Sequence, residues 1–538
     1  MAPISDIQFR QWLIAATVSL LLVLPVFFAS ANLEFASGSE NLVVATAMES
    51  HRTGEWVLPT LNELPRVKKP PLPMWWTAAF IPTSVIDAGD VQTLHRWVRL
   101  SVVPLTWLTL MSVFVIARRL GLSVNSAVVA MAACATSLMF ARFARSATTD
   151  VHLMAWVALA NAAWLTALVR KSVTSAVFCG VMLGLAFMSK GPVALAQCGL
   201  PMLVMWAWLR MPLGSAVQWI SGVVAFSLVA FPWYVAVYMS KADVAGTWLV
   251  ELHRSGATAF KADSPFTYVT MLALVFPWSV FFIVGLIDGA QRTWKRVAWD
   301  MPAIAFVLLA LPVLVMSFFP DRKDRYLLPM IVPASLLVAH GFGMVARKVG
   351  KFNATDKWVL ALHWVLLSAG PVVVGWMYWQ QNRVGLAATI VLGLLTAVAV
   401  GVWLTRRNIA NVVVVTALVA TAVNVLTLLS YSTTREGRSE LRPLAREILL
   451  QVADPEVIHV NPEGLFLGPN DLAIYLNRTV KLRTRVEDVP AQGPRQQVLV
   501  MMQPRKVIEP LSIEGWHRIA RATRDSDIYW AFVRQNSR

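Results

Sequence analysis

Long apolar runs separated by short polar stretches dominate the chain from its N-terminus to about Tyr431. A helix needs about 20 mostly apolar residues to cross the roughly 30 Å of bilayer hydrocarbon. The pattern therefore predicts a polytopic, all-α membrane protein with about thirteen spans. These are expected at about 11–31, 97–117, 123–142, 149–169, 173–189, 192–209, 215–238, 267–288, 301–319, 326–345, 357–379, 385–404 and 409–430.

A polar block, Asn32 to Pro73, follows the first run, and a shorter apolar run, Met74 to Ile86, follows the block. The shorter run has few residues for a span and is preceded by Pro70, Pro71 and Pro73. An interfacial or re-entrant helix is therefore expected there rather than a crossing helix. The first run is too long for the core of a signal peptide, so a retained span is expected.

The short run between 74 and 86 decides the orientation of every later span. If it does not cross, six basic clusters that separate the later runs all fall on one face, which the positive-inside rule makes cytoplasmic. If it crosses, the same clusters fall outside, against the rule. The clusters are Arg118–Arg119, Arg170–Lys171, Arg210, Arg292 to Arg296, Arg347 to Lys351 and Arg406–Arg407.

Counting the crossings in the same way places the remaining polar stretches on the opposite, extracytoplasmic face. Charge gathers there although the positive-inside rule expects little of it, so that face is expected to carry the function. The stretches are 32–73, 145–150, 189–192, 239–266, 320–325 and everything after Tyr431.

The tail after Tyr431 has the composition of a soluble domain. An amphipathic helix is expected over Leu441–Val452, followed by short alternating runs that predict strands. The strands are expected at Val457–Val460, Leu472–Leu476, Val498–Met502 and Ile528–Val533. Two domains are therefore predicted: a membrane domain over 1–431 and a small extracytoplasmic α/β domain over 432–538.

Composition agrees with this class, because 57% of the residues are hydrophobic and 14% are charged. The net charge of +17 is spread between apolar runs, which is typical of membrane topology and anionic-lipid contact rather than of nucleic-acid binding. Cys134, Cys179 and Cys198 lie inside apolar runs and are interpreted as packing residues. The sequence has no Gly-rich phosphate loop, so use of ATP or NAD is unsupported.

Charged residues of the extracytoplasmic face suggest chemistry on a phosphate ester. Cations neutralise a phosphate leaving group, and a carboxylate takes a proton from the attacking group. The alternative is that these charges anchor helix ends at lipid head groups. Asp150 and Lys190 are the strongest candidates, because each adjoins an apolar run. The carboxylates are Glu40, Glu49, Glu55, Glu63 and Asp150, and the cations are Lys68, Lys69, Arg145, Lys190, His253, Arg254, Arg322, Lys323 and Arg325.

Five stretches, in this order, resemble bacterial GT-C membrane glycosyltransferases similar to aminoarabinose (lipid A) transferases and protein O-mannosyltransferases. The resemblance covers about 12–340 well. It implies an inner-membrane enzyme that transfers a sugar, with inversion, from a polyprenyl-phosphate donor to a lipid or envelope-glycan acceptor on the periplasmic face. The stretches are LNELPRVKKPPLPMWW at 61–76, ARFARSATTD at 141–150, GLAFMSKGPVAL at 184–195, FPWYVAV at 231–237 and DRYLLP at 324–329.

The resemblance also implies residue roles. Lys69, Arg145 and Lys190 would bind the donor phosphate, and Asp150 would orient those cations or the acceptor. Arg322, Arg325 and Tyr326 are expected to add to the phosphate site, and His253 also matches the family pattern.

Two positions depart from the family pattern. Ser39 stands where the acceptor-activating Asp is expected, which leaves Glu40 as the candidate base, because a hydroxyl is no carboxylate base at neutral pH. Lys68 stands where relatives of the aminoarabinose type usually have a Glu that contributes to a metal site in some members. A metal bound by that route is therefore not expected, and no cofactor is assigned.

Two other classes stay open. The first is a catalytically degenerate relative that binds a lipid-linked sugar without turning it over, which the departures at Ser39 and Lys68 motivate. The second is a transporter or flippase, which should show broken helices in two halves and charges near mid-span. The chain instead gathers its charges at one face.

Overall fold

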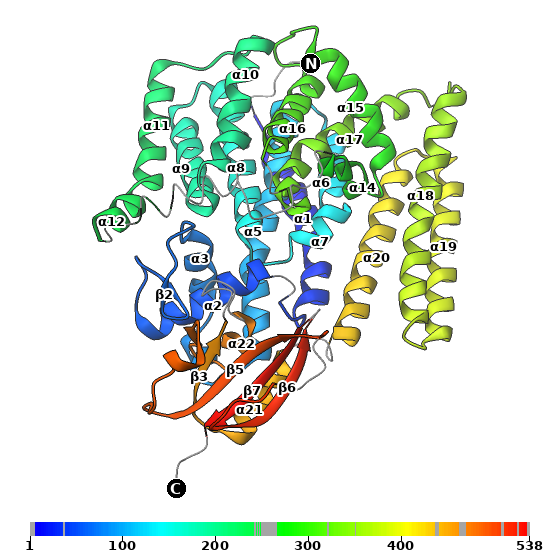
Figure 1. The fold of residues 1–538 in the computed structure, drawn as a ribbon. Coiled ribbons are helices and arrows are strands. Elements are labelled where there is room, and N and C mark those ends of the chain that lie inside the picture. The colour runs from blue at the N-terminus through cyan, green and yellow to red at the C-terminus, as the bar shows by residue number, and fades with distance from the viewer. Residues whose placement is uncertain are drawn as a thin grey trace. The chain divides into compact units, whose positions relative to one another are not determined.

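The protein is described from a computed structural model, which covers residues 6–35, 38–240, 244, 246, 248, 266–319, 322–349, 351–435, 441–461, 470–506, 511–524 and 527–534. The chain forms two compact units (Figure 1). The first comprises Met1–Ala31, Lys68–Leu72 and Arg99–Ser430, and the second comprises Asn32–Val67, Pro73–Val98 and Tyr431–Arg538.

Long apolar helices make up most of the first unit, as the hydropathy pattern predicts. In the described part of the chain, nine helices or continuous helix pairs are long and apolar enough to cross a membrane, or ten if a bent pair counts as one span. The chain is thus a multi-pass membrane protein. The nine are α1 (Phe9–Ser30), α5 (Val91–Arg119), α8 (Thr149–Arg170), α9 (Val173–Lys190), α11 with α12 (Ala216–Ala230, Pro232–Ser240), η3 with α17 (Asp324–Met330, Ile331–Ala346), α18 (Ala354–Trp379), α19 (Val384–Thr405) and α20 (Asn411–Arg435).

The remaining predicted spans are shorter or broken. The run at 123–142 forms α6 (Val124–Thr136) and α7 (Leu138–Phe143), and the run at 301–319 forms α16 (Met301–Ser317). The run at 192–209 begins as a π-helix, η1 (Leu195–Gly199), and continues as α10 (Leu200–Leu209). The run at 267–288 forms η2 (Thr267–Thr270), α14 (Met271–Leu274) and α15 (Ser279–Thr293), bent by 119° near Pro277, which has no N–H to continue the helix.

Glycines let two pairs of these helices approach backbone to backbone. A Cβ on Gly180 of α9 would overlap the carbonyl oxygen of Gly222 on α11. A Cβ on Gly285 of α15 would overlap the carbonyl oxygen of Leu337 on α17. Because buried backbone cannot easily shift, each pair is held at one separation and register.

The polar block and the short apolar run belong largely to the second unit. The block forms α2 (Gly38–Thr53), β1 (Thr60–Leu61) and β2 (Leu64–Pro65), and the run forms α3 (Leu72–Phe80) and α4 (Thr83–Asp87). The nine residues of α3 extend about 14 Å, so neither short helix can cross the hydrocarbon. The expectation of a non-crossing segment is therefore confirmed.

A carboxylate of α2 holds the hairpin between β1 and β2. The two turn residues, Asn62 and Glu63, have φ of 55° and 65°, as a two-residue hairpin of the primed type requires. The buried Glu49 side chain accepts hydrogen bonds from both turn N–H groups, at 2.7 Å from Asn62 and 3.0 Å from Glu63. Glu49, a candidate for chemistry on sequence grounds, therefore supports the backbone.

The tail forms a five-stranded mixed sheet in the order β4-β3-β5-β7-β6 (Figure 1). β3 is parallel to β4 and β5, and β5, β7 and β6 pair antiparallel. The amphipathic α21 packs Leu444 and Ile448 into the core of this sheet. The bounds are α21 (Arg442–Gln451), β3 (Pro455–Val460), α22 (Asn470–Tyr475), β4 (Lys481–Arg483), η4 (Val486–Asp488), β5 (Gln496–Pro504), β6 (Trp516–Arg524) and β7 (Asp527–Arg534).

One predicted strand of the tail is wrong. The run Leu472–Leu476 forms most of α22, whose residues Leu472–Tyr475 are all buried. A short, fully apolar run lacks the alternation that distinguishes a strand from a buried helix. The other predicted strands correspond to β3, β5 and β7, and the tail is the α/β domain that the sequence predicts.

The compact units divide the chain differently from the predicted domains 1–431 and 432–538. The second unit combines the tail with most of the polar block and the short apolar run. Arg442 contacts Glu34 at 3.1 Å, and Arg52 donates to the Asn477 side chain at 2.5 Å. These polar contacts join the first loop to the tail.

Candidate active site

The site begins at one end of the hairpin made by α8 and α9. Asp150 lies in the first turn of α8, where the helix dipole stabilises a carboxylate, and Lys190 is the last residue of α9, where the dipole stabilises a cation. The two side chains form an ion pair, with 4% of the Asp150 side chain and 10% of the Lys190 side chain exposed. Gly191 follows with a φ of 69°, a conformation that ends α9 directly after the lysine.

The short helix η3 brings two more of the predicted site residues to this pair. Arg325 Nε lies 3.4 Å from Asp150 Oδ2, so both carboxylate oxygens face a cation. Lys190 Nζ lies 3.8 Å from the centre of the Tyr326 ring, a cation–π contact. We call Asp150, Lys190, Arg325 and Tyr326 the Asp150 cluster; it holds two positive side chains against one negative side chain.

A second ion pair lies beside the cluster, and the sequence analysis did not assign it. Asp324, which precedes Arg325, lies 3.7 Å from Arg142 of α7 and accepts a hydrogen bond of 3.1 Å from Thr270 of η2. Both charged residues occur in stretches that resemble the family, ARFARSATTD and DRYLLP, so that resemblance was the available signal. The contacts tie η3 to two neighbouring elements.

One predicted phosphate ligand, Arg322, binds another part of the protein through its guanidinium, and a second, Arg145, is contacted through its backbone carbonyl. Both Nε and Nη2 of Arg322 donate to the carbonyl oxygen of Ser317, at 3.0 and 2.8 Å, and so bind the C-terminal end of α16. The carbonyl oxygen of Arg145 accepts a hydrogen bond from Arg99 Nη1 at 3.1 Å. Arg99 is buried in α5 and lines a cavity of about 30 Å³ together with Arg145. The sequence did not point to Arg99 as a site residue, because it is a single charged residue within a largely apolar run.

The remaining predicted residues lie outside the Asp150 cluster as defined. Lys68 and Lys69 are half-buried in the segment before α3. Ser39 and Glu40 belong to the second unit, in the first turn of α2, where Glu40 is fully buried and Ser39 is half-buried. His253 lies outside the described residues.

His, Cys, Asp and Glu are the side chains that would hold a metal ion. Across the described ranges, no three side chains of His, Cys, Asp or Glu gather as metal ligands would.

The chain is similar to known glycosyltransferases over part of its length. Residues 80–247 match the family described as dolichyl-phosphate-mannose-protein mannosyltransferase. The undecaprenyl phosphate-alpha-4-amino-4-deoxy-L-arabinose arabinosyl transferase of Edwardsiella ictaluri is 25% identical over 56% of this chain and 53% of its own length. The enzyme of that name from Pectobacterium carotovorum is 24% identical over 63% and 59%. The chain thus spans little more than half the length of these curated relatives.

Solved structures extend the likeness over the whole chain. ArnT from Cupriavidus metallidurans, bound to undecaprenyl phosphate, superimposes with a TM-score of 0.76 over 98% of this chain and 99% of its own, at 19% identity. Its apo form gives a TM-score of 0.75. The chain therefore has the fold of a GT-C membrane glycosyltransferase. Within that class it is similar to the aminoarabinose transferases, as its sequence motifs predict.

These likenesses also bear on the compartment. The similar proteins are bacterial, and helical multi-pass proteins of bacteria reside in the inner membrane, whereas outer-membrane spans are β-barrels. The chain is accordingly a multi-pass inner-membrane protein.

Proposed function

We propose that the protein is an inverting membrane glycosyltransferase. It moves a pentose or hexose from a polyprenyl-phosphate carrier to a lipid or envelope-glycan acceptor at the periplasmic face. The Asp150 cluster is the observation that carries this proposal. Its two cations, Lys190 and Arg325, exceed its one carboxylate in charge, and the buried Asp150 orients both of them.

The charges of the cluster suit a phosphate leaving group. Asp150 contacts Lys190 and Arg325 through different oxygens, so it sets the relative positions of the two cations before any substrate arrives. One positive charge exceeds the carboxylate, and in a site of low dielectric such an excess strongly favours a dianionic or monoanionic phosphate. Lys69 and Arg145 are the further cations proposed for the same phosphate.

The donor class is supported by the shared fold. The similar structure of ArnT holds undecaprenyl phosphate, and the curated relatives are named for an undecaprenyl-phosphate-linked sugar. A carrier of this kind keeps its lipid tail in the hydrocarbon while its phosphate reaches the charged end of the helices.

The ends of the helices support the proposed orientation. α8 begins at the Asp150 cluster and ends at Arg170, next to Lys171, so the cluster and this basic turn lie at opposite ends of one span. α5 ends at Arg118 and Arg119. Since basic residues favour the cytoplasmic side, the Asp150 cluster is proposed to lie at the periplasmic side.

The proposed reaction needs one base and one neutralised leaving group. Glu40 accepts the proton of the acceptor hydroxyl, the acceptor oxygen forms a bond to the anomeric carbon, and the bond from that carbon to the phosphate oxygen breaks. The carrier leaves as polyprenyl phosphate, stabilised by the cations that Asp150 orients.

A transfer assay in liposomes tests the proposal. The purified chain, an undecaprenyl-phosphate-linked sugar and a bacterial lipid extract are combined, and products are identified by mass spectrometry. Transfer to a lipid in the wild type, lost in Lys190→Gln, is the expected result. Transport of the intact donor across sealed vesicles without transfer would instead make the protein a flippase.

Ser39 favours one second candidate, a relative that binds the lipid-linked sugar without turning it over. In that case the wild type binds the donor but transfers nothing. Restoring the family residue with Ser39→Asp would then create activity.

A further inference from the structure

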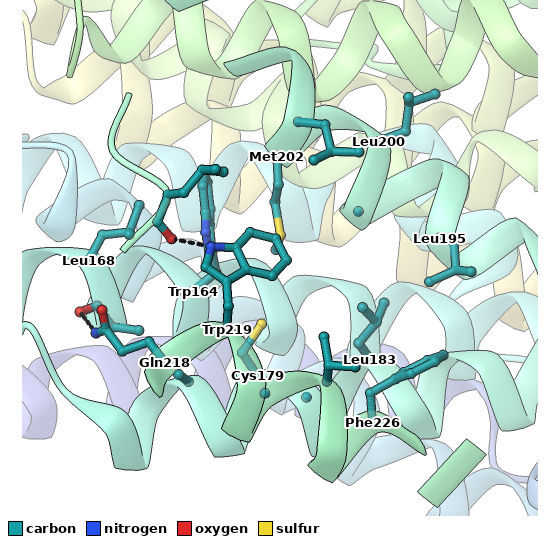
Figure 2. A pocket seen from close by; sticks show the side chains of 18 of the residues that line it. Trp164, Leu168, Cys179, Leu183, Leu195, Leu200, Met202, Gln218, Trp219 and Phe226 are labelled. Atoms are coloured by element: carbon teal, nitrogen blue, oxygen red, sulfur yellow. Dashed lines mark hydrogen bonds between the residues drawn. The ribbon is translucent and has the colours of Figure 1, made fainter. Parts of the chain in front are cut away.

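A large apolar cavity lies in the first unit, away from the Asp150 cluster. Its volume is about 550 Å³, within the range of roughly 300–1,000 Å³ that ligand pockets span. Helices α8, α9, α10 and α11 form its walls together with η1 (Figure 2). Side chains that line it include Trp164, Leu183, Leu200, Met202, Trp219 and Phe226.

Two polar side chains of the wall are hydrogen-bonded to backbone, whereas the buried Trp164 Nε1 has no hydrogen-bond partner among the described residues. Gln218 donates to the carbonyl oxygen of Ala167 at 2.9 Å, and Trp219 Nε1 donates to the carbonyl oxygen of Leu213 at 2.7 Å (Figure 2). Apart from the Trp164 N–H and the Cys179 thiol, the wall is mostly methyl, methylene and ring surface. Such a wall favours a hydrocarbon occupant over water, which would find too few partners there.

The cavity opens sideways between helices. Leu203 of α10 and Val223 of α11 line it, yet 48% and 52% of their surfaces are exposed. In a membrane-spanning bundle, exposed apolar side chains face lipid. A lipid chain can therefore enter the cavity from the bilayer.

Its position separates the cavity from the proposed sugar-transfer site. Trp164 lies fourteen residues after Asp150 on α8, a distance of about 21 Å along the helix axis. The α8 part of the wall thus belongs to the opposite half of the span, whereas Leu183 lies seven residues, about 10 Å, before Lys190 on α9.

Basic residues stand at the end of the helices nearest the cavity. Lys171 follows the last turn of α8, three residues after Leu168 of the cavity wall, and Arg210 follows the last residue of α10. Both are exposed. The sequence has no acidic residue between Asp150 and Asp243, and Asp6, which lies at this end, contacts Arg170 at 3.7 Å. Lys171 and Arg210 add positive charge that attracts an anion.

We propose that this cavity is a binding site for one acyl chain of an anionic phospholipid, whose head group contacts Lys171 and Arg210. The lipid comes from the leaflet opposite the Asp150 cluster. It fills space that the bundle leaves open and holds α10 against α11.

A substitution at Gly199 can fill the cavity without disturbing its neighbours. It lines the wall at the end of η1, has a helical φ of −64°, and a Cβ there would meet no atom within 4 Å. Gly199→Phe should therefore place a ring in the cavity without displacing the backbone. Gly393→Phe is the matched control, because Gly393 is exposed on α19 and also has no atom within 4 Å of a built Cβ.

The test measures lipid binding to the purified full chain by native mass spectrometry, with phosphatidylglycerol or phosphatidylcholine added in mixed micelles. The wild type and Gly393→Phe should retain one phosphatidylglycerol with a Kd at least fivefold below that for phosphatidylcholine. Gly199→Phe should raise that Kd at least tenfold. Equal binding by Gly199→Phe and the wild type would overturn the proposal, as would a wild type that retains no lipid.

Two further measurements separate the parts of the proposal. Phosphatidylglycerol carrying a photoreactive acyl chain should crosslink the wild type on the walls near Leu183 and Met202, which needs no variant; crosslinks confined to α18–α20 would contradict the site. The double variant Lys171→Gln, Arg210→Gln should bind both lipids equally. An unchanged preference for phosphatidylglycerol would remove the two basic residues from the site.

Discussion

Asp150 and Lys190 stand 40 positions apart in the chain and form a buried ion pair at one end of a helical hairpin. Arg325 approaches the same carboxylate from a third element. Each side chain thus depends on the others for its place, so a substitution of one should displace the others and lower the proposed sugar transfer.

Replacing Asp150 by Asn should abolish most of the proposed sugar transfer. The variant keeps the size of the side chain but leaves Lys190 and Arg325 without their shared carboxylate, and breaking a buried pair typically costs about 3–5 kcal/mol. We expect transfer in liposomes to fall by at least about 100-fold. Asp90→Asn, an exposed change at the start of α5, is the control. Normal transfer by Asp150→Asn would show that the cluster is not needed.

Two substitutions of Tyr326 distinguish the contribution of its ring to donor binding from that of its hydroxyl. Tyr326→Phe keeps the ring that Lys190 contacts, whereas Tyr326→Ala removes it. A cation–π contact at a partly buried site contributes about 1–2 kcal/mol, so Tyr326→Ala should weaken donor binding roughly tenfold. Tyr326→Phe should stay within about twofold of the wild type in a Kd titration with the lipid-linked sugar. Equal losses in the two variants would instead assign the hydroxyl a direct contact with the donor.

Glu40→Gln tests the proposed base. Loss of a general base typically slows a reaction by about 10²–10⁴-fold, and donor binding should change little. Glu55→Gln is the matched control, because Glu55 is an exposed glutamate of the same loop. Unchanged turnover in Glu40→Gln would remove Glu40 from the mechanism.

Glu49→Gln should loosen the β1–β2 hairpin without touching the Asp150 cluster. The carboxylate accepts from two turn N–H groups, and a buried amide in its place meets one of them with an NH₂ group. The loss is expected to be about 1–3 kcal/mol. Amide hydrogen exchange over residues 60–65 measures it, and exposed Glu63→Gln should leave the exchange unchanged.

His459 should make the tail less stable in acid. Burial in β3 lowers its pKa from 6.5 to about 4. Between these values the unfolded chain takes up a proton that the folded chain does not, so stability falls as the pH drops, by at most about 3 kcal/mol. Hydrogen exchange of β3 and β5 in the full chain should accelerate from pH 7 to pH 4.5 after correction for intrinsic rates. His459→Gln should reduce this pH dependence, whereas the exposed His517→Gln should leave it unchanged.

The membrane helices could be predicted because hydrophobicity alone specifies a span. The breaks within them could not, since the π-helix at Leu195–Gly199 and the bend near Pro277 depend on how neighbouring helices pack. In the tail, β6 was missed because its sequence, WHRIARATR, is rich in charge. An edge strand tolerates such residues, while the pattern of a buried strand excludes them.

The candidate site was predicted in part. Asp150, Lys190, Arg325 and Tyr326 were named from the sequence, and the structure brings them together. Arg322 was also named, but its guanidinium binds the end of α16. The sequence could not distinguish Arg322 from the cluster residues, because a charged residue next to an apolar run can bind a ligand or a helix end equally well. Only the positions of its partners in the fold show which it does.

The two close-packed glycine contacts have a mechanical consequence. Gly180 joins α9, which carries Lys190, to α11, and Gly285 joins α15 to α17, which continues from the helical turn carrying Arg325. Each pair is held as one rigid unit, and the contact of Lys190 Nζ with the Tyr326 ring, 3.8 Å from its centre, joins the two pairs. If the two helix pairs move relative to one another, the distance between Lys190 and Tyr326 changes, so a distance probe placed across this contact would report the movement.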